Sequence, residues 1–181
     1  MLIRYGYEIS INCAQATPVV CLLSAHGERA GDIRKPEMIT TTPEIATTTY
    51  HDLFGNLCRR FMAPAGDLTI RGDAVLEDSG ALDPVDFSAG EIPVGELPDE
   101  TLVYLMGSRY CETDKLSQTA WNLFGNSPTG WARVQDICDY VNGHIRFGYQ
   151  DARSTRGALE AWQERIGVCR DFAHLAIAFC R

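Results

Sequence analysis

The chain has 181 residues, 45% of them hydrophobic and 22% charged, which is typical of a globular protein with one large or two small domains. Its formal net charge of −8 and pI near 4.9 argue against nucleic acid as a partner, because phosphate binding requires a basic surface. No apolar run is long enough to span a bilayer and no leader pattern is visible, so we expect a cytoplasmic protein with no membrane partner.

The first 78 residues carry the patterns of extended strands. Residues 3–13 alternate apolar and polar side chains, as a half-buried strand does, and residues 68–76 alternate in the same way. Residues 19–23 and 47–61 are also expected to be extended, the second segment folding back at Phe54-Gly55-Asn56, where Gly and Asn tolerate left-handed backbone angles. We therefore predict an antiparallel β-domain over residues 1–78, built as a small β-sandwich.

Residues 79–100 contain Pro84, Pro93 and Pro98 together with several glycines and acidic residues. Proline removes a backbone donor and fixes one backbone angle, so this stretch is not expected to continue a sheet or to hold a regular helix. We predict a linker here, followed by a helical region over residues 101–181. The predicted fold class is therefore α+β.

The apolar spacing becomes helical after the linker. A first helix is predicted over residues 114–124, ended by Gly125, and a second after Ser127-Pro128, ended by Gly143. Residues 145–149 are expected to be extended. A short helix capped by Ser154 or Thr155 should follow and should end at Gly167, which breaks the chain before Cys169.

The last predicted helix runs from Cys169 to Arg181 and is apolar around most of its circumference. Such a helix normally packs between other elements. No residue after it is present to cover it, so we expect the domain to continue past Arg181.

Seven cysteines are scattered along the chain without a CxxC pair and without histidine at metal-ligand spacing. We therefore expect no metal site and no cofactor, and each cysteine is first interpreted as a small buried hydrophobe. Cys169 differs because it begins a helix, where the free N–H groups and the helix dipole favour a thiolate and can bind an oxyanion. The alternative, that Cys169 merely starts a buried helix, fits these local features equally well.

The run from Gly167 to Arg181, GVCRDFAHLAIAFCR, resembles the nucleophile motif of bacterial transglutaminase-like cysteine proteases. Three further stretches are similar to parts of the same family: the hairpin Asp52-Leu53-Phe54-Gly55-Asn56, the run from Ser108 to Asp114, and the run from Gly130 to Asp139. Together these stretches extend the resemblance over nearly the whole chain.

The resemblance implies the helical first half of a papain/transglutaminase-like catalytic core, with Cys169 as nucleophile, a histidine as general base and acid, and an aspartate that orients the imidazole. In this family the histidine and the aspartate lie on strands that follow the nucleophile helix, and the sequence ends before them. We therefore expect the 181-residue chain to be inactive by itself.

None of the four histidines is expected to replace the missing base. His174 lies five residues after Cys169, which on a helix is about 140° around the axis and about 7.5 Å along it, outside hydrogen-bond reach. His26, His51 and His144 have no neighbours in the sequence that mark a base.

The remaining matches to the motif are interpreted as structural. Arg170 and Asp171 are expected to form a cap and a local ion pair. Trp121, Trp131 and Trp162 are expected to pack in the core, as are Cys111, Cys138 and Cys180.

Three functions remain open at this point. The first is acyl transfer through a Cys169 thioester on a peptide or protein substrate, ending on water or on an amine. The second is a binding or scaffold module whose β-domain engages a partner and whose exposed C-terminal helix is covered in a homo-oligomer. The third is a thiol redox sensor, which would require a resolving cysteine that the sequence does not indicate.

Overall fold

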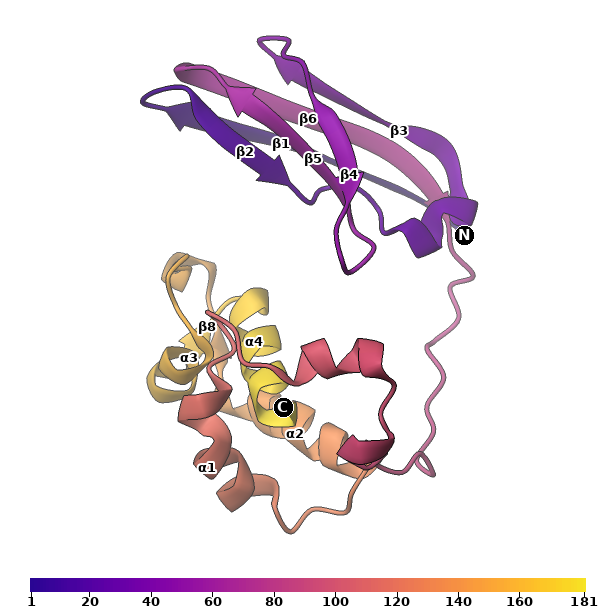
Figure 1. The fold of residues 1–181 in the computed structure, drawn as a ribbon, viewed down its shortest axis with the longest axis vertical. Helices are drawn as coiled ribbons and strands as arrows, with labels where there is room; N and C mark the ends of the chain where they lie inside the picture. Colours follow the sequence, from indigo (N-terminus) through magenta and orange to yellow (C-terminus); the bar gives the residue numbers. More distant parts are fainter. The chain divides into compact units, whose positions relative to one another are not determined.

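The computed structural model describes residues 1–181 and divides into two compact units, Met1–Asp83 and Pro84–Arg181. The first unit consists of antiparallel sheets and the second mainly of helices, so the predicted α+β class is confirmed (Figure 1). No helix of the chain is both long enough and apolar enough to cross a membrane.

The first unit contains two three-stranded antiparallel sheets. In the first sheet the long strand β6 (Gly66–Glu77) lies between β1 (Leu2–Cys13) and β3 (Ile33–Thr42). In the second sheet β5 (Leu57–Ala63) lies between β2 (Thr17–Cys21) and β4 (Thr48–His51). Figure 1 shows both sheets in indigo to magenta.

The two sheets share one apolar core. Phe61 and Ala63 of β5 and Leu68 and Ile70 of β6 are its buried centre, and partly buried residues of the other strands surround them. This burial follows from the alternation of side chains along each strand, which sends every second residue to the inner face. The alternation of β1 and β6 in the sequence is therefore explained by their shared inner face.

Strand β3 was not predicted. Its pairing with β6 shifts register twice, between Ile33 and Lys35 and again between Lys35 and Met38, and Pro36 lies in between. A register shift interrupts the alternation of apolar and polar side chains, so the sequence of β3 lacks the signal that marked β1. The predicted turn at Phe54-Gly55-Asn56 is present, with Gly55 at a φ of 80°.

The second unit contains four α-helices and a short parallel pair of strands. The helices are α1 (Thr113–Phe124), α2 (Trp131–His144), α3 (Ala158–Glu164) and α4 (Cys169–Cys180). The strands are β7 (Arg146–Phe147) and β8 (Ile166–Gly167). The core of the unit includes Leu116 of α1, Ile137 of α2 and Leu175 of α4, so these three helices pack around one centre.

Short 3₁₀ helices occur in both units, at Gly27–Asp32, Val94–Glu96, Asp99–Leu105 and Tyr149–Asp151. The predicted linker, residues 79–100, contains no strand and no α-helix. Its residues after Asp83 belong to the second unit: the Phe87 ring contacts Trp131 at 6.4 Å between centroids, and the Trp131 N–H donates to the Ala89 carbonyl at 2.9 Å.

The predicted helix ends are partly wrong. Helix α2 begins after Gly130, which has a φ of 77°, and not after Ser127-Pro128. A side chain at Gly130 would also collide with the backbone of Gly90, its Cβ lying 2.8 Å from Gly90 Cα, so only glycine fits this turn. Helix α2 continues through Gly143 to His144, and α3 is preceded by Gly157 instead of Ser154 or Thr155.

Candidate active site

Cys169 is the first residue of α4, and its side chain is exposed. The chain reaches it through a tight connection from α3: Arg165 ends α3 with a left-handed φ of 56°, β8 then pairs with β7, and Val168 is extended immediately before the helix. The first N–H groups of a helix have no acceptor within it. The thiol therefore lies at a helix N-terminus, as predicted, and the structure shows that it is open to solvent.

The carboxylate of Asp171 holds this N-terminus in place. Asp171 is 1% exposed, and its Oδ2 accepts a hydrogen bond of 2.9 Å from the Val168 N–H, which caps the helix. Arg170 forms a weaker ion pair with Oδ1 at 3.5 Å. The predicted cap and local ion pair are both present.

Arg156 is the partner of Asp171 that the sequence did not indicate. Its side chain is 4% exposed, and its Nη1 lies 3.1 Å from Asp171 Oδ2. The same Nη1 donates to the Asp151 carbonyl at 2.9 Å, and Nε donates to Glu164 Oε2 at 3.0 Å. A buried arginine with three acceptors therefore connects Asp151, the end of α3 and the start of α4.

Gly167 is required for close packing and not for a sharp turn. We expected glycine to allow the turn into the helix, but its φ is not positive. A Cβ at Gly167 would lie 2.6 Å from the Cβ of Asp171 and 2.8 Å from its Oδ2. Glycine here therefore lets β8 approach the buried carboxylate.

The two sides of α4 differ. Asp171, Leu175, Ala178 and Phe179 are buried on one side, whereas Cys169, Ala173, Ile177 and Cys180 are exposed on the other. The prediction that Cys180 is buried is therefore wrong. Its surroundings still exclude enough water to raise the pKa of the Cys180 thiol, and the nearby Cys138 raises it further, so Cys180 stays protonated at neutral pH.

His174 is held by packing contacts, and its position five residues along the helix places it outside hydrogen-bond reach of Cys169. Its ring stacks on Tyr110 at 5.3 Å between centroids, and Arg170 lies over the same Tyr110 ring at 5.4 Å. Burial and, to a smaller extent, the positive charge of Arg170 lower the pKa of His174, whereas Asp171 opposes this. A neutral imidazole packed against a tyrosine is a structural residue.

The imidazole of His144 is also held by contacts within the helical unit. Its Nε2 is 2.7 Å from the Trp162 carbonyl, and its ring stacks on Tyr140 at 4.9 Å. The Trp162 indole in turn donates to the Tyr140 hydroxyl at 3.1 Å, which closes the group. The other two histidines, His26 and His51, belong to the first unit.

Five of the six residues expected in the core are exposed or only half-buried, Cys180 among them. Trp121 is 63% exposed and Cys138 is exposed, so the prediction that they pack in the core is wrong for both residues. Cys111 is buried, as expected, and Trp131 and Trp162 are half-buried. The error arose because spacing alone does not reveal which side of a helix meets the core when both sides carry apolar residues.

Aromatic side chains lie next to the start of α4. Phe172 is on the same side of the helix as Cys169, because residues three apart are neighbours on a helix surface. Phe147 lies 6.3 Å from Phe172 and 5.0 Å from Tyr149, measured between ring centroids. Phe147 and Tyr149 are 48% and 74% exposed, so they present an apolar surface close to the connection that carries the thiol.

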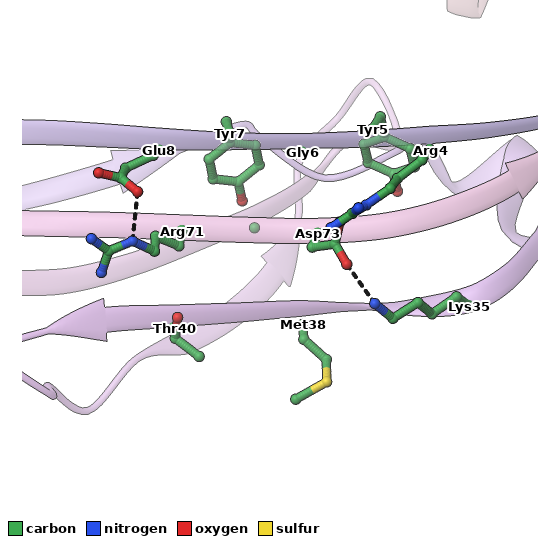
Figure 2. A pocket seen from close by; sticks show the side chains of 11 residues that line it. Arg4, Tyr5, Gly6, Tyr7, Glu8, Lys35, Met38, Thr40, Arg71 and Asp73 are labelled. Atoms are coloured by element: carbon green, nitrogen blue, oxygen red, sulfur yellow. Dashed lines mark hydrogen bonds and ion pairs between the residues drawn. The ribbon is translucent and has the colours of Figure 1, made fainter.

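A hollow of about 600 Å³ lies in the first unit, on the outer face of the β1-β6-β3 sheet. It opens over Gly6, which has no side chain to fill it. Figure 2 shows its charged residues paired with one another: Arg71 Nε is 2.7 Å from Glu8 Oε2, and Asp73 lies between Arg4 and Lys35. This hollow is lined by neither a cysteine nor a histidine, and the structure brings no group of His, Cys, Asp and Glu together as metal ligands.

Two comparisons with known proteins give a match. Residues 117–181 match the family model of the transglutaminase-like superfamily. The fold is similar to that of a proposed cysteine protease from Cytophaga hutchinsonii, with a TM-score of 0.81 and 23% sequence identity. That similarity covers 99% of this chain and 65% of the other, so the chain spans 65% of the length of that protein. At this identity the comparison establishes a shared fold.

No curated protein matches the sequence. The family match nevertheless includes α2, α3 and α4, and therefore the helix that Cys169 begins. Residues 117–181 are therefore similar to the transglutaminase-like superfamily.

Proposed function

We propose that Cys169 is the nucleophile of a transglutaminase-like cysteine peptidase or acyl transferase. The observation that carries this proposal is the exposed thiol at the first residue of α4, inside the segment that matches the superfamily. A helix N-terminus favours the thiolate over the thiol, and exposure allows a substrate to reach it. A buried thiol at the same position would have favoured a packing role.

The proposed reaction is acyl transfer through a thioester. The Cys169 thiolate attacks the carbonyl carbon of an amide, and the first-turn N–H groups of α4 stabilise the negative oxygen that forms. The C–N bond then breaks while an imidazolium donates a proton to the departing amine. Water or a second amine attacks the thioester, gives its proton to the imidazole and releases the thiolate.

The base of this reaction is proposed to come from outside residues 1–181. His174 is held against Tyr110 and His144 against Trp162, so neither histidine of the helical unit is available to Cys169. The chain spans 65% of the length of the C. hutchinsonii protein, which leaves room for further catalytic groups in a longer protein. On this proposal a histidine and an aspartate on strands after α4 complete the site, and residues 1–181 alone do not turn over substrate.

A peptide or protein substrate is proposed because the thiol is open and because Phe147 and Tyr149 offer apolar contacts near it. All seven cysteines are free thiols, which supports a reducing compartment such as the cytoplasm.

The exposed side of α4 favours a second candidate, a non-catalytic scaffold. Ala173 and the 41% exposed Ile177 form an apolar stripe on this side. If a second copy of the chain covers this stripe, the unit is a homo-oligomer and Cys169 is buried in the interface. Sedimentation of the chain at increasing concentration distinguishes a dimer from a monomer.

The experiment that tests the enzymatic proposal uses the protein encoded by the complete gene. We expect hydrolysis of peptide esters or amides, with turnover lost in Cys169→Ser and retained in Cys138→Ser. Cys138 is the matched control because its thiol is also exposed but lies in the middle of α2. Equal activity of Cys169→Ser and the wild type would contradict the proposal.

A further inference from the structure

Arg156 connects the two ends of the segment that carries Cys169. Glu164, at the end of α3, accepts from Arg156 Nε, and Asp171, in the first turn of α4, accepts from Nη1. Between these two contacts the chain passes through Arg165, β8 and Val168 to Cys169. The arginine therefore links residue 164 to residue 171, and we call this pair of contacts the clip.

The clip fixes the first turn of α4 from the inside. The same Asp171 oxygen that receives Arg156 also receives the Val168 N–H, the backbone group immediately before Cys169. Gly167 packs directly on the Asp171 side chain, because a Cβ there would lie 2.6 Å from the Cβ of Asp171. A movement of Asp171 therefore has to move Gly167 and Val168, and with them the thiol.

The clip also has an electrostatic effect. Asp171 has a side chain with 0% exposure, within one helical turn of Cys169, so water does not screen its negative charge. A second negative charge at Cys169 is disfavoured beside an unpaired carboxylate and is favoured once that carboxylate is neutralised. Arg156, with 4% exposure, is the cation in the most buried contact with Asp171, whereas Arg170 is 34% exposed and 3.5 Å away.

We propose that Arg156 is a positioning residue for the Cys169 nucleophile, holding the first turn of α4 and neutralising Asp171 so that a thiolate is tolerated at Cys169. This inference rests on the proposed function of Cys169. Arg156 does not touch the substrate or the thiol in this role and acts through Asp171 alone.

The test is the rate at which iodoacetamide alkylates Cys169 in residues 1–181, with Cys138 in the same sample as the internal reference. Mass spectrometry of the two cysteine peptides gives both rates, between pH 6 and pH 9 and below the unfolding temperature. In the wild type we expect Cys169 to react faster than Cys138 at neutral pH. Arg156→Gln should slow Cys169 about tenfold, because it leaves a buried carboxylate beside the thiol without its main cation, and should leave Cys138 unchanged.

Three further variants separate charge from folding. Arg153→Gln is the matched control, because the Arg153 side chain pairs with Glu160 and Glu164 but does not reach Asp171, so we expect wild-type rates. Arg156→Lys keeps a positive charge and should recover part of the alkylation rate at Cys169. If Arg156→Gln does not fold, Arg156→Lys takes its place in the test. Arg156→Gln combined with Asp171→Asn removes both charges and should restore most of the rate at Cys169.

The outcomes distinguish this inference from the proposed function. If Cys169 reacts no faster than Cys138 in the wild type, the proposal that Cys169 is an activated nucleophile is wrong. If Cys169 is fast in the wild type and equally fast in both Arg156 variants, the thiol is activated without Arg156, and the inference is overturned while the proposed function stands.

Discussion

The two units of the chain differ in whether they contain a buried ion pair. In the first unit Arg4, Lys35 and Asp73 lie together on the outer face of a sheet, at the surface, and the core beneath the sheet is apolar. In the second unit Arg156 and Asp171 form a pair that is almost fully buried, at the start of the helix that carries Cys169. Surface pairs contribute little to stability, whereas removing one partner of a buried pair leaves an uncompensated charge.

The contrast between surface and buried ion pairs indicates where polar groups determine structure in this protein. The sheets of the first unit are specified by the alternation of apolar and polar side chains and by apolar packing. Their charged side chains lie at the surface. In the second unit a buried charged group fixes one particular turn, the turn from α3 to α4. Two charged residues 15 positions apart in the sequence therefore meet at the start of the helix that carries Cys169.

The largest predicted effect follows from removing the buried cation. Arg156→Gln should lower the free energy of unfolding of the helical unit by about 3–5 kcal/mol, because it leaves Asp171 buried without its main partner. Urea unfolding followed by tryptophan fluorescence measures this effect, since Trp121, Trp131 and Trp162 all belong to the second unit. A loss no larger than that of Arg153→Gln would show that the pair does not hold the turn.

A second carboxylate of the helical unit, the partly buried Glu112, should have an intermediate effect that depends on pH. Glu112 accepts from the Leu159 N–H at 3.1 Å and from Lys115 at 2.7 Å, and Glu112→Gln should cost about 1.5–3 kcal/mol at pH 7. Burial raises the pKa of Glu112, but the bonds from Lys115 and Leu159 outweigh it, so the net pKa is lowered from 4.5.

A lowered pKa fixes the direction of the pH dependence. The stability that Glu112 contributes is present above pH 4.5 and is lost as the pH falls through the lower pKa of the folded state. The wild type and Glu112→Gln should therefore become more alike on acidification below that pH. Asp114→Asn, at an exposed position in the same helix turn, is the control, and a difference that is independent of pH would contradict this explanation.

Packing in the first unit should be sensitive at Gly72. A Cβ at Gly72 would lie 2.4 Å from the ring of Tyr7, its partner across the sheet, so Gly72→Ala should destabilise the unit by about 1–3 kcal/mol. Gly31→Ala is the matched control because nothing lies within 4 Å of its added Cβ. Hydrogen exchange of peptides from residues 1–83 measures both variants, and equal protection in the two would show that Tyr7 moves aside freely.

The smallest effect is expected for the surface ion pairs. Asp73→Asn removes the common partner of Arg4 and Lys35, but water screens all three side chains, which are 31–76% exposed. We expect the midpoint of unfolding of the first unit to change less than it does for Gly72→Ala. If Asp73→Asn instead equals Arg156→Gln in its effect, the contrast between surface and buried pairs fails.

Much of the fold could be predicted where one local pattern decides the structure. The alternation in β1 and β6, the turn at Gly55 and the helix that begins at Cys169 all follow from residues close in sequence. Strand β3 escaped prediction because its two register shifts interrupt the alternation. Local sequence patterns predict regular helices and strands well, but they miss an element that contains an irregularity.

The candidate site could be predicted only in part, for a related reason. Cys169 and the cap by Asp171 are local features, and the motif around them was informative. Arg156 lies 15 residues before Asp171, in a stretch with the composition of an exposed loop, so nothing in its neighbourhood indicated a buried role. Trp121 and Cys138 illustrate the opposite error, since apolar side chains at helical spacing were assigned to a core that they do not reach.

The central claim is that Cys169 forms a covalent acyl intermediate. The most direct measurement is mass spectrometry of the protein encoded by the complete gene, quenched with acid during turnover of a peptide ester. The account predicts the mass of the acyl group on the peptide that contains Cys169, and its removal by hydroxylamine, which cleaves thioesters. Turnover with the acyl group on another residue, or with no covalent intermediate in conditions where the substrate saturates the enzyme, would contradict the account.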